Sequence, residues 1–202
     1  MSGPVRDSYR YSLSLTEGWY PITPTGGQDA PDIDGLVSTL SLADGQEAGF
    51  RAAVDAVWRF ACVGMVDGSE RWVLVRDKRS GRIDAVLSLD LHASHGVSGP
   101  DAYSELAKAE TGGDGAIEVI NRTIDRHELS VGTAIAIHDF ALPRPDPEPS
   151  GPATERAVLG LFLNTEPMMV EFSLITQDLG LTDSITEYLL RIVGTFEIEK
   201  TQ

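Results

Sequence analysis

The sequence predicts an α+β protein with a single, mostly antiparallel sheet and helices packed on its faces. Several segments rich in β-branched and apolar residues follow one another with short connections, and strands joined in this way usually pair antiparallel. Segments whose apolar residues recur every three or four positions flank this series, and such amphipathic helices can cover the faces of a sheet. The 202 residues, 42% of them hydrophobic, favour one folded domain over residues 1–202.

The chain begins with a predicted strand over residues 9–15, in which aromatic and leucine side chains alternate with polar ones. Gly18 and Pro21 end this strand, and a loop rich in proline, glycine and aspartate is expected at residues 23–33. Trp19 stands between the two residues that break the strand. We expect its side chain to fill the edge of the core where the first strand leaves the sheet.

The next predicted element is a helix over residues 45–63, where an apolar stripe recurs at helical spacing. A β-hairpin follows, with strands at residues 71–77 and 82–94 and with Gly81 suited to a left-handed position in the turn. Residues 100–110 predict a short helix that begins with a proline in its first turn.

The second half of the chain predicts four further strands and a final helix. The strands are residues 116–124, 132–142, 155–164 and 168–179. A proline-rich loop at residues 143–153 is expected to be an exposed connection, because proline cannot continue a central strand. The final helix is predicted to begin at a cap formed by Thr182 or Asp183 and to end at Gly194, before a short extended piece.

Acidic residues outnumber basic ones by 31 to 16, which gives a formal net charge of −15. This balance repels nucleic-acid phosphates and anionic membranes, so neither is a predicted partner. It favours solubility, and binding to a basic partner is the alternative interpretation. The N-terminal residues lack the apolar part of a secretory signal, so a cytoplasmic location is expected. The single cysteine, Cys62, is expected to be a buried and inert thiol.

Two segments carry a resemblance to a known family. They are YRYSLSLTEGWYPI at residues 9–22 and MMVEFSLITQDLGLTDSITEYLLRIVGTFEI at residues 168–198. With the order of elements between them, they resemble the PsbP-like α/β/α sandwich, although Thr16 stands where that family usually has a proline before its Glu-Gly-Trp corner. The resemblance implies a binding or assembly role and supplies no catalytic residues. Arginine far exceeds lysine, as in high-GC bacteria, so a bacterial and actinobacterial origin is expected.

His92 and His95 are the candidate metal ligands, with Asp90 near them in the sequence. Two histidines and a carboxylate can hold zinc. Residues three apart on a strand face opposite sides, so the two rings converge only if the strand ends soon after His92. The alternative is a polar strand end that runs into a loop. No cofactor is predicted.

The candidate partner-binding residues are Trp19 and the hairpin-tip cations Arg76, Lys78 and Arg79. Acidic residues interleave with these cations, so the alternative is a solvated hairpin with ion pairs that each contribute little. No catalytic set is predicted. His138 and Asp139, the one adjacent histidine–acid pair of a predicted strand, face opposite sides of it.

The sequence therefore predicts a non-enzymatic protein–protein interaction module, an accessory, adaptor or chaperone-like factor in a bacterial assembly or secretion process. An unidentified protein partner is expected, and a homodimer is a further prediction because the proline-rich segment could be exchanged between two copies. The alternative is a small-molecule or metal-binding module that uses a pocket near Trp19 and the loop at His92 and His95.

Overall fold

The computed structural model describes residues 9–23, 31–61, 69–93, 99–109, 117–143, 152–166 and 168–200. In chain order they form β1 (Tyr9–Ser12), β2 (Trp19–Pro21), α1 (Ile33–Thr39), α2 (Glu47–Ala61), β3 (Glu70–Leu74), β4 (Ala85–Ala93), α3 (Pro100–Ala109), β5 (Ile117–Leu129), β6 (Gly132–Pro143), β7 (Thr154–Leu163), β8 (Met168–Thr176), α4 (Ile185–Val193) and β9 (Glu197–Lys200). No helix of these described ranges is long and apolar enough to cross a bilayer.

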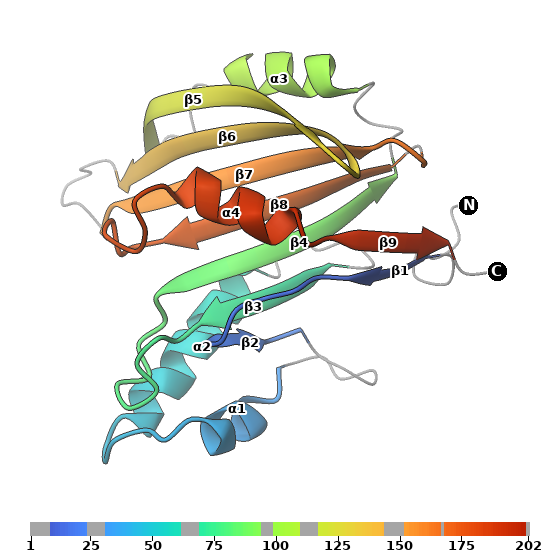
Figure 1. Ribbon diagram of the computed structural model, residues 1–202. Helices are drawn as coiled ribbons and strands as arrows, with labels where there is room; N and C mark the ends of the chain where they lie inside the picture. Colours follow the sequence, from blue (N-terminus) through green and yellow to red (C-terminus); the bar gives the residue numbers. More distant parts are fainter. Residues whose placement is uncertain are drawn as a thin grey trace.

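The strands form two sheets, in which every pair of the described strands is antiparallel. The larger sheet has seven strands in the order β2-β3-β4-β8-β7-β6-β5, and the smaller pairs β1 with β9 (Figure 1). The predicted α+β class and antiparallel pairing are confirmed. The prediction of a single sheet is wrong, because the two chain ends pair with each other.

The separate small sheet follows from where the first strand stops. The predicted strand at 9–15 ends at Ser12, and the chain turns at Gly18, whose φ of 98° favours glycine, before β2 joins the edge of the large sheet. The Ser14 N–H donates to Thr195 Oγ1 at 3.0 Å, so the segments that follow β1 and precede β9 are also joined. These contacts hold β1 beside β9 and away from the large sheet.

One face of the large sheet carries the main apolar core. Helix α4 packs against β6, β7 and β8 on this face, and the β1–β9 pair lies beside it (Figure 1). Ala134 on β6 and Ala157 on β7 are almost fully buried, and their small side chains let the helix approach the strands closely. Ile185 and Leu189 of α4 are buried against this surface, which is why the final segment forms an amphipathic helix.

The opposite face is covered at its two ends by different helices. Helices α1 and α2 pack over β2 and β3, where Phe50 and Val54 belong to one apolar cluster with Val73, and α3 packs over β5, β6 and β7 (Figure 1). Directly opposed residues of antiparallel strands share a face, and the register runs from Val73 across β4 and β8 to Arg156 on β7 and Asp139 on β6. The charged residues near α3 therefore lie on the same face of the large sheet as the residues that α2 covers, but at the opposite end of that face.

Most predicted helices and strands are confirmed, with shifted ends. Helices α2 and α3 lie within their predicted segments, and strands β3 to β8 match the hairpin and the four later strands. The predicted cap of α4 is wrong, because Ser184 accepts the hydrogen bond from the Glu187 N–H at 3.2 Å. Helix α1 was not predicted. Cys62 and most of the proline-rich loop lie outside the described residues, and the single domain stays a prediction.

Candidate functional site

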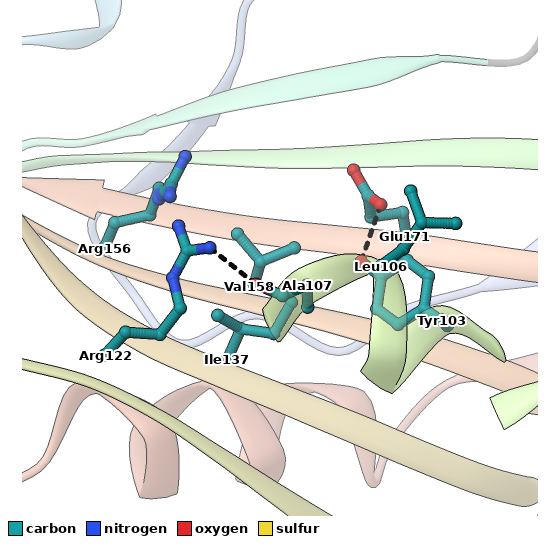
Figure 2. A pocket seen from close by; sticks show the side chains of 8 residues that line it. All are labelled: Tyr103, Leu106, Ala107, Arg122, Ile137, Arg156, Val158 and Glu171. Carbon is teal, nitrogen blue, oxygen red and sulfur yellow. Dashed lines mark hydrogen bonds between the residues drawn. The ribbon is translucent and has the colours of Figure 1, made fainter. Parts of the chain in front are cut away.

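A pocket of about 310 Å³ lies between α3 and the large sheet. We call it the α3 pocket. Its lining residues are Tyr103, Leu106, Ala107, Arg122, Ile137, Arg156, Val158 and Glu171. Figure 2 shows that the two arginines lie together at one side and that Tyr103 and Glu171 lie at the other. The pocket is therefore built by one helix and four strands, β5 to β8.

The arginine end of the α3 pocket is organised by Asp139 of β6. Arg122 Nε donates to Asp139 Oδ2 at 2.9 Å, and Arg156 Nε donates to Asp139 Oδ1 at 2.9 Å. The side chain of Asp139 is 1% exposed, whereas those of Arg122 and Arg156 are 15% and 34% exposed. Burial alone would raise the pKa of Asp139, but the hydrogen bonds and charges of Arg156 and Arg122 outweigh it and hold that pKa below its ordinary value.

Arg122 reaches this position because β5 carries a bulge. Ile120 faces Phe140 and Thr123 faces His138, so two residues of β5 stand opposite Asp139 alone. The first of the two, Asn121, has a φ of 54°, which asparagine tolerates better than most residues do. Bulges commonly redirect a side chain, and here the second bulged residue is Arg122. The β5 bulge therefore determines the arginine end of the pocket.

The same arginine also holds α3 in place. Arg122 Nη1 donates to the backbone carbonyl of Ala107 at 2.7 Å (Figure 2). This carbonyl lies in the last turn of α3, where unpaired carbonyls and the helix dipole favour a cation. Arg122 thus links the C-terminal end of α3 to β5 and, through Asp139, to β6.

The opposite end of the pocket contains a tyrosine–glutamate pair. The Tyr103 hydroxyl donates to Glu171 Oε2 at 2.8 Å (Figure 2). The Tyr103 ring lies against Gly160 of β7, where a Cβ atom would be only 2.7 Å from Tyr103 Cε1. It also makes an edge-on contact with Phe162, with ring centroids 5.9 Å apart. Gly160 is therefore needed for the ring to lie close to the sheet.

Apolar side chains lie between the two polar ends. Ile137 of β6 and Val158 of β7 are direct neighbours across the strands and form the sheet side of the pocket. Leu106 lines the pocket from α3 and remains 51% exposed, which is unusual for a leucine among the described residues. An apolar lining with a few convergent polar groups is the usual composition of a ligand site.

The hairpin-tip cations lie elsewhere, at the connection between β3 and β4. Arg76 pairs with Asp178 and with Asp84, the latter at 3.3 Å, and Lys78 pairs with Glu17 at 2.9 Å. Arg79 is exposed. Ion pairs within the chain thus engage two of the three hairpin-tip cations, as the alternative interpretation expected. Their role toward a partner stays a prediction.

Charge reversal at Arg76 and at Arg79 should have different effects on stability. Arg76→Glu should lower the free energy of unfolding by about 1–3 kcal/mol, because the 3%-exposed carboxylate of Asp84 loses one of its cations and gains a like charge nearby. Arg79→Glu should change it by no more than about 0.5 kcal/mol. Urea unfolding measures both. Equal losses would contradict this account, and Arg79→Glu is the variant that tests the tip as a partner contact without unfolding the hairpin.

Trp19 is buried in the main core. The residue is 8% exposed, and its Nε1 donates to the Tyr188 hydroxyl of α4 at 3.0 Å. The prediction that Trp19 fills the core edge is confirmed, since β2 is the edge strand of the large sheet. Its role as a partner contact stays a prediction.

The structure describes only one of the two predicted metal ligands, His92. His92 lies on β4, where its Nε2 is buried without a hydrogen-bond partner among the described residues, and His95 lies outside them. Asp90 accepts a hydrogen bond from Arg71 Nη2 at 2.9 Å and another from the Ser69 hydroxyl. Across the described ranges, no group of three or more histidine, cysteine or acidic side chains could hold a metal ion. The metal site stays a prediction.

The helices and the antiparallel sheet place this protein in the α+β class, and the α3 pocket lies between one of those helices and the sheet. Comparison with solved structures finds the solution structure of cyanobacterial PsbP (CyanoP) from Synechocystis sp. PCC 6803, with a TM-score of 0.45, 10% sequence identity and 98% of each chain covered. That protein is of the family that the sequence resembles. No protein-family model and no curated protein matches the chain.

Proposed function

We propose that this protein is a non-enzymatic interaction module that accepts a segment of a partner protein in the α3 pocket. The observation that carries the proposal is the pocket itself, which joins apolar walls to polar groups at both ends. Its side chains stand on strands and a helix, and such elements hold binding groups more firmly than loops do. An accessory, adaptor or chaperone-like role in a bacterial assembly or secretion process is part of this proposal.

The ionisation of Asp139, behind the arginine end of the pocket, favours a structural role over proton-transfer chemistry for this residue. A general acid or base works best when its pKa lies near the operating pH. The pKa of Asp139 is held below its ordinary value, which already lies far under neutral pH. Both of its oxygens accept hydrogen bonds from arginines, so this carboxylate positions the guanidinium groups.

Filling the pocket tests the proposal. Val158→Phe adds a ring to the pocket wall, and Val86→Phe makes the same change on β4, on the same face but outside the pocket lining. We expect tagged wild-type protein and Val86→Phe to capture the same stoichiometric protein partner from the source cells, and Val158→Phe to lose at least about nine-tenths of it. Circular dichroism and thermal unfolding should show that both variants are folded.

Undiminished capture by a folded Val158→Phe variant would contradict the proposed role of the pocket. Loss of the partner from both variants would point to the shared sheet face instead, and would also contradict it. Quantitative mass spectrometry of the captured material distinguishes these outcomes.

Small-molecule binding is a second candidate function, favoured by the size of the pocket. Its volume of about 310 Å³ is at the lower end of the range of ligand sites, roughly 300–1,000 Å³, so a compact ligand would fit. Mass spectrometry of small molecules released from denatured wild-type protein, with Val158→Phe protein as the control, tests this candidate. A compound released by the wild type alone would favour it over a protein partner.

A further inference from the structure

We propose that the α3 pocket binds the carboxyl-terminal end of an extended, apolar peptide, with the terminal carboxylate at the Arg122–Arg156 end and the chain running toward Glu171. This inference rests on the proposed function and specifies the chemistry of the partner segment. It follows from three features of the pocket: the sign of the charge at each end, the separation of the two ends, and the apolar wall between them.

The charge at the arginine end suits a carboxylate. Arg156 lines the pocket and has a 34%-exposed side chain, so a ligand that fills the pocket contacts this cationic side chain. Asp139 binds both arginines, has only 1% of its side chain exposed and does not line the pocket, so the surface offered at this end is the cations and not the acid. Guanidinium groups match the planar geometry of carboxylates.

The charge at the other end suits hydrogen-bond donors. Glu171 lines the pocket from β8, and its carboxylate accepts the Tyr103 hydroxyl. A backbone N–H of a bound peptide can donate to a carboxylate, whereas the peptide's own carboxylate would be repelled by it. The two ends therefore select one direction of the bound chain.

The separation of the ends fits about three residues. Arg156 faces Ile175 across the β7–β8 pair, and Glu171 lies four positions before Ile175 on β8. Four positions along a strand span roughly 13 Å, so the backbones of Arg156 and Glu171 lie about this far apart along the strand direction. Their side chains extend from the sheet at these two positions. An extended tripeptide is roughly 10 Å long. Ile137, Val158 and the exposed Leu106 would lie along its apolar side chains.

Matched peptides test the inference. The probes are acetyl-Ala-Val-Ala with a free carboxylate, the same peptide with a C-terminal amide, and pentanoate as a small carboxylate without a peptide chain. We expect NMR titration of the wild-type protein to give an affinity for the free acid at least about tenfold higher than for the amide, because hydrogen bonds to a charged group are among the stronger ones. Pentanoate should bind more weakly than the peptide acid.

Two variants locate the carboxylate. Glu171→Gln should keep the preference for the acid over the amide, because the carboxylate does not lie at that end. Arg156→Gln should reduce this preference to less than about threefold. The peptide series on the wild-type protein remains decisive if Arg156→Gln does not fold.

The inference fails separately from the proposed function. The inference would be overturned by equal affinities for acid and amide, by binding of neither peptide, or by a preference that Glu171→Gln abolishes. The proposed function would still stand in these cases if Val158→Phe abolished partner capture. Pentanoate that binds as tightly as the peptide acid would also overturn it and favour a small carboxylate ligand. Capture that survives Val158→Phe contradicts the proposed function, whichever peptide binds.

Discussion

Asp139→Ala is expected to lower the free energy of unfolding by about 3–5 kcal/mol, because it leaves the charges of Arg122 and Arg156 without the carboxylate between them. The loss should be large because the Asp139 side chain is 1% exposed and Arg122 is also mostly buried. Urea unfolding at pH 7 measures it. Asp125→Asn, on the exposed part of β5, is the control and should change stability by no more than about 0.5 kcal/mol.

The pH dependence of this difference provides a second check. The pKa of Asp139 is lowered in the folded protein from an ordinary value of 3.8, so its ionised form stabilises the fold at every pH above that value. As the pH falls below about 3.8 and through the folded pKa, the carboxyl becomes protonated and this contribution disappears. The stability difference between wild type and Asp139→Ala should therefore be constant above pH 5 and shrink in acid. A difference that stays flat down to pH 3 would contradict this account.

The predictable parts of the fold are those whose signals are local. The apolar stripe of α2 and the runs of β-branched and apolar residues in β3, β4 and the later strands each lie within one segment of sequence, so a local pattern identifies them. The pairing of β1 with β9 is different. It joins the two ends of the chain, and no property of residues 9–12 alone indicates whether their partner is β9 or the large sheet.

The α3 pocket could not be predicted for the same reason. The sequence predicts that Asp139 and His138 face opposite sides of their strand, and this is confirmed: His138 pairs with Glu155 at 2.9 Å, while Asp139 binds the two arginines. What the sequence does not show is that β5 and β7 flank β6. The β5 bulge, which directs Arg122 inward, also depends on register.

One local signal could have pointed to the pocket. In the predicted strand, neighbouring residues that share a face with Asp139, such as Ile135 and Ile137, are apolar, and a charged residue on such a face must be paired if it is buried. That argument identifies Asp139 as a residue in need of a cation. It does not choose between Arg122, Arg156 and the other arginines, because the choice depends on which strands are neighbours.

Trp19→Ala is expected to destabilise the protein by about 3–5 kcal/mol, the usual cost of truncating a buried tryptophan to alanine. Trp19 lies opposite Leu74 on β3 and belongs to the core that α4 covers, so its removal leaves a cavity between the edge strand and the helix. Thermal and urea unfolding measure the loss, and Tyr188→Phe isolates the Nε1 hydrogen bond, whose removal should cost only about 1–2 kcal/mol.

The comparison of these two variants decides between the roles considered for Trp19. If Trp19 mainly supports the core, Trp19→Ala loses much more stability than Tyr188→Phe, and Trp19→Phe recovers a large part of the loss because it refills most of the cavity. Partner capture by Trp19→Phe should then equal that of the wild type. A Trp19→Ala variant that is as stable as the wild type but captures no partner would show instead that Trp19 is a binding residue, and would contradict its place in the core.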